Sequence, residues 1–194
     1  PLLVQVHGCI VVKTMVKYGI AQSEFIRRTR AQVDANPKAF FADKDWRNIT
    51  PNGGRFVSLN DNRKLLVSSF DIKAIAMWVP HLVIPNHVPC CPHCERSKFV
   101  DLNSCKWITT PKILFGVRGH RYLDTMLYYC RSCDKRFAGY NMKSLQLDSK
   151  HILGFFNFNL SRHFAVDDAL YSDIVNSANQ PTAQIYQRLE QNVT

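Results

Sequence analysis

Two C-x-x-C pairs constrain this chain more than any other feature of its sequence. Cys91 and Cys94 form the first pair, Cys130 and Cys133 form the second, and 35 residues lie between them. A tight turn of this spacing aims two sulfurs at one point, and two such turns supply the four thiolates of a tetrahedral zinc site, with Zn–S distances of about 2.3 Å. Four thiolates would close the coordination shell, so we expect one structural zinc ion.

The remaining cysteines leave one question about the site open. Cys90 precedes Cys91 directly and can replace it as the first ligand. His93 lies inside the first pair, where we expect an exposed turn residue rather than a donor. Cys9 and Cys105 are predicted to be buried free thiols. Seven cysteines, four of them in metal-type pairs, favour a reducing, intracellular compartment over a disulfide scaffold.

Charge indicates the chemical class of the partner. The chain has 194 residues, and its composition, 46% hydrophobic and 21% charged, is that of an ordinary globular protein. Its net charge is nevertheless +10 at pH 7. Such an excess predicts a polyanionic partner, most simply nucleic acid. The apolar stretch 2–20 is broken by polar residues, so neither a membrane span nor a signal peptide is expected. Because the chain begins with Pro1, we expect a fragment or a processed product.

The hydrophobic pattern predicts an α+β protein in three parts. Residues 1–70 are expected to form helices and then a hairpin, residues 71–145 a β-rich, zinc-ribbon-like module, and residues 146–194 a helical region. Apolar residues recur at helical spacing within 1–35, Ser23 is a candidate N-cap for a second helix there, and Asn36-Pro37 should end it. Strands are predicted at 55–59, 64–67, 107–109, 113–115, 125–129 and 135–140, with a further buried strand ending at Pro80.

Three helices are predicted in the last part. The first starts at Asp148 or Ser149 and extends to Phe158, the second is capped by Asp167, and the third follows Pro181. The last two could form a helix-turn-helix, but the third carries Arg188 as its only cation. We therefore expect this pair to pack internally or to form an oligomer contact, by self-association or with a protein partner.

The basic excess concentrates around the cysteines. Residues 90–150 hold eleven lysines and arginines against five acidic residues. A glycine-flanked turn at 116–121 should present cations outward, and further cations follow the second cysteine pair. The predicted nucleic-acid contacts are Arg118, His120, Arg121, Arg131, Lys135 and Arg136. The aromatic residues among them are expected to serve mainly as packing.

Catalysis is not expected. His120 and Asp124 could suggest general base chemistry, but no third partner is evident in the sequence, and a closed metal shell offers no reactive position. The leading interpretation is therefore a nucleic-acid-binding module, with DNA favoured over RNA. The alternative is a zinc-containing scaffold subunit that docks proteins through its C-terminal helices.

The order of these motifs resembles a known family. Ile75-Ala76-Met77-Trp78-Val79-Pro80, then Cys91-Pro92-His93-Cys94, Trp107 and Tyr128-Tyr129-Cys130-Arg131-Ser132-Cys133 are similar to a zinc-binding domain of unknown function found in eukaryotic transposon-derived proteins. The resemblance covers about residues 70–165. It implies zinc at Cys91, Cys94, Cys130 and Cys133, a DNA-associated and hence nuclear role, and catalytic residues outside this chain.

Overall fold

The computed structural model combines helices and strands, which confirms the α+β class. It describes residues 4–6, 9–11, 19–51, 56–60, 63–67, 72–117 and 119–177. In chain order the elements are β1 (Val4–Val6), β2 (Cys9–Val11), α1 (Ile20–Ala35), α2 (Pro37–Asp43), β3 (Phe56–Asn60), β4 (Arg63–Val67), β5 (Ile75–Trp78), α3 (Pro80–Val83), β6 (Val100–Trp107), β7 (Lys112–Gly116), β8 (Gly119–Cys130), β9 (Lys135–Ala138), α4 (Met142–Leu147), α5 (Lys150–Phe156), β10 (Phe158–Leu160), β11 (Phe164–Asp167) and α6 (Asp168–Ser177).

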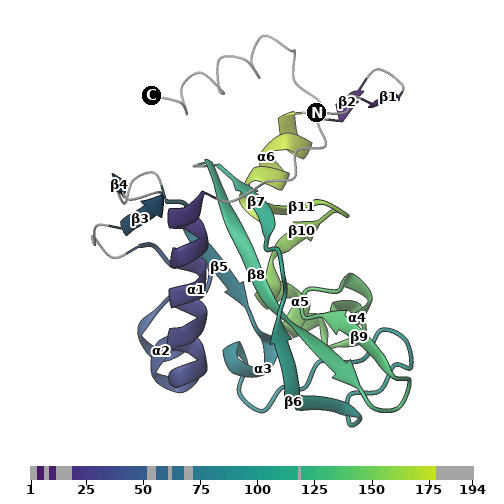
Figure 1. The fold of residues 1–194 in the computed structure, drawn as a ribbon. Coiled ribbons are helices and arrows are strands. Elements are labelled where there is room, and N and C mark those ends of the chain that lie inside the picture. Colours follow the sequence, from purple (N-terminus) through teal and green to yellow (C-terminus); the bar gives the residue numbers. More distant parts are fainter. Residues whose placement is uncertain are drawn as a thin grey trace.

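The long strand β8 organises a seven-stranded sheet (Figure 1). The strand order is β10-β11-β7-β8-β5, and β6 and β9 pair with the second half of β8. Tyr122 in the first half of β8 lies opposite Ile113 of β7 and Ile75 of β5. Strands β5 and β8 run parallel, as do β7 and β11, and the other pairs are antiparallel. One strand thus connects the central sheet to the cysteine-rich end.

Helices cover the two faces of the sheet. Strand β5 is buried at all four positions, as the sequence predicts for a strand ending before Pro80. Its side chains alternate between faces. Ile75 and Met77 pack into a core with residues of α1 and α2, whereas Ala76 and Trp78 pack into a second core with residues of α4 and α5. A third core lies between β6, β8 and β9 and includes Cys91 and Cys130.

The N-terminal region differs from its prediction. Strands β1 and β2 form an antiparallel hairpin where helical spacing was expected, because short runs of Val and Ile also suit strands. Helix α1 begins after Gly19, and Ser23 lies inside it rather than capping it. Asn36 ends α1 as expected. It also starts α2, which the sequence reading missed, since its side chain accepts the Ala39 N–H at 3.1 Å. The predicted hairpin at 55–67 is confirmed as β3 and β4.

The C-terminal region contains strands as well as helices. The predicted helix from Ser149 ends at Phe156, and Phe158 begins β10 instead. Strand β11 then pairs in parallel with β7, so this region extends the central sheet. Asp167 caps α6 as predicted, because its carboxylate accepts the Leu170 N–H at 2.9 Å. The third predicted helix lies outside the described residues.

Candidate metal centre

The first cysteine pair lies on a loop between α3 and β6. The Cys91 carbonyl accepts the Glu95 N–H at 2.9 Å, which closes a tight turn around the pair. Glu95, the residue after the second cysteine of this pair, has a left-handed backbone conformation with a φ of 60°. This backbone region favours glycine, so the turn is held here against a local conformational cost.

The second pair lies in the turn between β8 and β9 and has the same local shape. Asp134, again the residue after the second cysteine, has a φ of 54°. Its carboxylate accepts the Tyr129 hydroxyl at 2.7 Å. The Arg131 N–H donates to the Phe99 carbonyl at 2.9 Å, which ties this turn to the chain that leaves the first one. Two equivalent turns from distant parts of the sequence therefore face each other.

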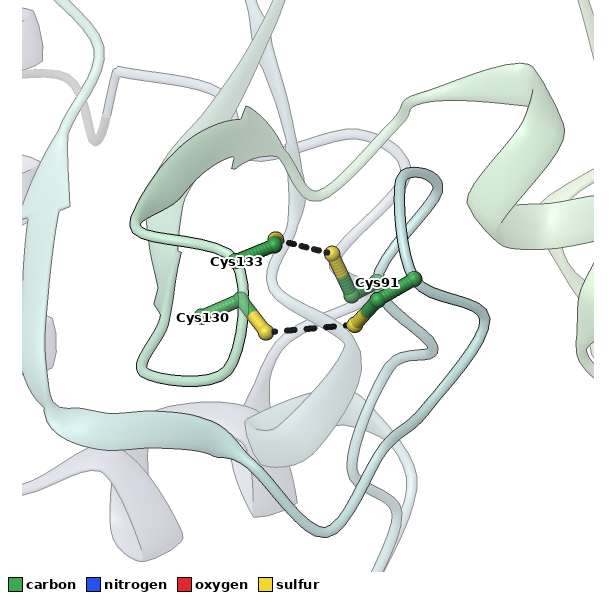
Figure 2. Close-up of side chains that lie close together, drawn as sticks. Cys91, Cys130 and Cys133 are labelled. Atoms are coloured by element: carbon green, nitrogen blue, oxygen red, sulfur yellow. Dashed lines mark hydrogen bonds between the residues drawn. The ribbon is translucent and has the colours of Figure 1, made fainter.

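The four paired sulfurs converge at this point. Figure 2 shows the side chains of Cys91, Cys130 and Cys133 directed into the space between the two loops. The Sγ atoms of Cys91 and Cys133 lie 3.5 Å apart, as do those of Cys94 and Cys130, and all four sulfurs lie within 4.8 Å of one another. A tetrahedron with 2.3 Å metal–sulfur bonds has sulfur–sulfur edges of about 3.8 Å. The cluster therefore has the size that a tetrahedral metal ion requires.

The environment of the sulfurs couples metal binding to proton release. Cys91 and Cys130 are fully buried, and Cys94 and Cys133 are half-buried. Desolvation and the neighbouring sulfurs of Cys91 and Cys130 raise the pKa of Cys133 to about 12. Without a cation, the Cys133 thiol thus favours its protonated form at neutral pH. A divalent ion would displace the protons and bind the thiolates.

A group of polar side chains anchors the first cysteine loop to the helical layer. Asp148, which is almost fully buried, accepts the Cys90 N–H at 3.2 Å, and the Ser144 hydroxyl donates to the Cys90 carbonyl at 2.6 Å. His87 Nε2 lies 3.2 Å from the other Asp148 carboxylate oxygen. Both backbone polar groups of Cys90, the residue before Cys91, are therefore held by hydrogen bonds. Sequence analysis assigned Asp148 only a helix-capping role, since 58 residues separate it from Cys90.

The other cysteines and His93 are now placed. Cys91, not Cys90, joins the cluster, so the register that the sequence left open is resolved. His93 is exposed, as expected. Cys105 is half-buried rather than buried, and burial raises the pKa of its thiol to about 11. The side chain of Cys9 lies outside the described part of the structure.

The predicted nucleic-acid contacts do not form one surface. Arg131, Lys135 and Arg136 are exposed beside the second cysteine pair. His120 lies near the opposite end of β8, about 33 Å from Cys130 at 3.3 Å per residue. The predicted exposed turn is shorter than expected, since β8 already begins at Gly119, and Arg118 lies outside the described residues.

Two of these cations are engaged in ion pairs. Arg121 is partly buried and donates to Asp167 at 3.1 Å, on the sheet face opposite to His120. Arg131 is exposed and donates through Nε to Asp101 at 3.0 Å. Lys135 and Arg136, in contrast, have no carboxylate within ion-pair distance among the residues that the structure describes. Within this described part of the chain, these two are unpaired cations beside the second cysteine pair, as Arg96 and Lys98 are beside the first.

Among the described residues, His120 and Asp124 do not form the hydrogen-bonded pair that a general base would require. Asp124 is fully buried and receives two hydrogen bonds from Arg30 of α1, each 2.8 Å long. His120 is exposed at the end of the same strand. Asp124 therefore has a structural role, joining α1 to the sheet.

Comparison of the chain with protein families, with curated proteins and with solved structures finds no significant match. Among the described helices, none is both long and apolar enough to cross a membrane. The metal centre is thus characterised by its geometry alone.

Proposed function

We propose that this protein is a zinc-stabilised nucleic-acid-binding module, with DNA favoured over RNA. The convergence of four cysteine sulfurs on one point supports the metal. Tetrahedral sites of four thiolates hold zinc or iron. We favour zinc because it is not redox-active and is the usual ion of purely structural sites. In this proposal β6, β8 and β9 form the zinc-ribbon-like unit, and the ion supplies part of the small core between them.

Metal analysis tests the first half of the proposal. We expect one zinc ion per chain by mass spectrometry under non-denaturing conditions, with no iron–thiolate absorbance. Cys91→Ser should lose the ion, whereas Cys105→Ser, which alters a half-buried thiol outside the cluster, should retain it. A Cys91→Ser protein that still binds one zinc ion would contradict this site.

The charge around the metal centre supports the nucleic-acid partner. Of the five acidic residues between positions 90 and 150, Asp124 and Asp148 have side chains at most 4% exposed, and Asp101 is bound by Arg131 at 9% exposure. The cations Lys135 and Arg136 remain exposed. Glu95 and Asp134 are exposed at the two cysteine turns, but the exposed cations Arg96, Lys98, Lys135 and Arg136 outnumber them, which favours contact with phosphates.

Salt dependence tests the second half. Binding of a labelled 20-base-pair duplex should weaken steeply between 50 and 200 mM salt, because each phosphate contact releases counterions. Lys135→Ala/Arg136→Ala should weaken binding and reduce the salt slope by about two, one for each contact. Lys38→Ala, which removes an exposed cation from α2, is the control and should bind as the wild type does. Absence of duplex binding at 50 mM salt would refute the proposal.

A second candidate function is a zinc-containing scaffold that docks proteins through its C-terminal part. It is supported by α6, where Tyr171, Ile174 and Val175 are about half exposed, at 47%, 55% and 49%. Exposed apolar side chains grouped on one helix are typical of protein contacts. Light scattering over a concentration series tests this, since a scaffold of this type should self-associate or bind a protein partner without any affinity for nucleic acid.

The proposal contains no enzymatic step. Four thiolates would complete the tetrahedral shell, which leaves no coordination position for a reactive water.

A further inference from the structure

One part of the central sheet is covered by helices on a single face. Helices α4 and α5 cover the face to which Leu114 of β7 and Ala165 of β11 point. On the other face α1 lies over β5 and β8, where Arg30 reaches Asp124. Figure 1 shows β10 and β11 on the side of β7 that is remote from α1. Helix α6 begins after β11 and approaches β7 and β10, but Phe115 and Phe164 stay exposed, so the α1 side of β7 and β11 is partly open within the described part of the molecule.

Aromatic side chains occupy this open area. Because residues alternate along a strand, the neighbours of Leu114 and Ala165 point to the open face. Phe115 and Phe164 are each 41% exposed, and their rings meet edge to face with centroids 5.7 Å apart. His120 lies opposite Phe115 on β8 and is exposed too. We call this surface the aromatic face: Ile113, Phe115, His120, Phe164 and Val166.

The charge of the aromatic face distinguishes between possible partners. The exposed strand positions that open onto it carry no carboxylate of their own within the described residues, and the nearest acidic group is Asp168, whose carboxylate accepts the Asn159 side-chain N–H at 2.7 Å. Arg162 and His163 are exposed in the turn that leads into Phe164. Lys112 Nζ donates to the carbonyls of Ser161 and Arg162 at 2.7 and 2.9 Å, which holds this turn against β7. An aromatic floor beside a fixed cationic turn complements an anionic ligand with flat apolar groups.

We propose that the aromatic face binds single-stranded nucleic acid. Unpaired bases would stack on Phe115 and Phe164, and Arg162 would contact the backbone phosphates. Duplex DNA does not offer this interaction, because its bases are already stacked on one another. The inference rests on the proposed function only in assuming that nucleic acid is the partner. It assigns a second surface, about 33 Å along β8 from the cations beside the metal centre.

Fluorescence anisotropy with two kinds of probe tests this surface. The probes are a labelled 12-nucleotide oligo(dT) or oligo(rU), which form no duplex, and the 20-base-pair duplex used above. For Phe115→Ala/Phe164→Ala we expect the affinity for the single strands to fall about tenfold or more for each ring, and the duplex affinity to remain unchanged. Phe115→Trp should retain binding, because indole stacks at least as well.

Controls separate stacking from unspecific loss of apolar surface. Tyr171→Ala removes an exposed aromatic ring from α6 and should leave single-strand binding intact. Both phenylalanines are more than half buried and pack against each other, so the double variant should lose some stability but remain folded under the binding conditions, as its urea midpoint will show. His120→Ala offers a milder change on the same surface and should also weaken single-strand binding.

Each other outcome overturns the inference. Duplex binding without single-strand binding would refute the aromatic face while leaving the proposed function intact, and failure to bind either probe would refute both. A large loss of stability in the double variant without single-strand binding would show that another segment of this chain covers the face. Loss of self-association in the double variant, with no change in single-strand affinity, would assign the face to a second copy of the chain.

Discussion

The buried ion pair between Arg30 and Asp124 leads to a sharp prediction about stability. Arg30 Nε and Nη2 each donate a hydrogen bond of 2.8 Å to the Asp124 carboxylate, and Nη2 also donates to the Ile108 carbonyl at 2.9 Å. The Asp124 side chain is 0% exposed and that of Arg30 18%. Arg30→Met keeps most of the apolar stem but leaves a buried carboxylate with the Thr125 N–H as its remaining described donor.

Removing one partner of a buried pair costs about 3–5 kcal/mol, because the other charge stays in the interior uncompensated. Arg27→Met on the same helix provides the matched control. Arg27 pairs with Glu24 at 2.7 Å, but its side chain is 70% exposed, and such solvent-screened surface pairs contribute little to stability. In Arg30→Met/Asp124→Leu both charges are absent, and we expect this variant to be more stable than Arg30→Met.

Urea unfolding of the metal-loaded proteins, followed by tryptophan fluorescence at pH 7, measures these differences. Burial raises the pKa of Asp124, and Arg30 opposes this effect. Without Arg30 the carboxyl group should take up a proton in the folded state more readily than in the unfolded chain, so the deficit of Arg30→Met should shrink as the pH falls. If Arg30→Met costs no more than Arg27→Met, or if its deficit does not depend on pH, the pair does not hold α1 to the sheet as inferred.

Three further perturbations follow from single sites. Burial lowers the pKa of His81 from 6.5 to about 4, so the neutral ring is favoured in the fold, and its contribution is present above pH 6.5 and lost as the pH falls towards 4. His81→Gln should therefore flatten the pH dependence of the unfolding free energy in this window. The shift in pKa sets an upper limit of about 3 kcal/mol on this effect, and solvent screening of the partly exposed ring reduces it. An unchanged pH profile of urea unfolding would contradict this. Glu95→Gly should not destabilise the protein and should raise the unfolding free energy by up to about 1 kcal/mol, since glycine adopts the left-handed backbone of the first cysteine turn without strain; a loss of zinc affinity would argue against that geometry. Gly139→Ala should cost about 1–3 kcal/mol, because its Cβ would lie 2.6 Å from Thr125 Oγ1 and 3.0 Å from Tyr128 Cε2, whereas Gly154→Ala in α5 meets no atom within 4 Å and should be neutral or stabilising in the same thermal melts.

Local patterns in the sequence determined the chemistry of the metal centre. The C-x-x-C spacing identified Cys94, Cys130 and Cys133 as candidate ligands, and the structure brings their sulfurs together, because a tight turn requires only neighbouring residues. Local signals also located the end of α1 at Asn36 and the cap of α6 at Asp167. Short strands at the N-terminus and the hairpin β10–β11 were missed, since brief apolar runs fit helices and strands equally well.

Long-range packing decided the rest of the site. The adjacent Cys90 and Cys91 both remained candidates for the first ligand by sequence, and in the structure Cys91 joins the cluster while Asp148 and Ser144 hold the backbone of Cys90. The length of β8 separates His120 from Arg136 by most of the sheet, although both follow from one basic segment of the sequence. The sequence by itself determined which atoms can bind a metal and that the chain is strongly basic. The tertiary structure decided which cations stay free, because burial and pairing with carboxylates distant in sequence depend on how the strands and helices pack.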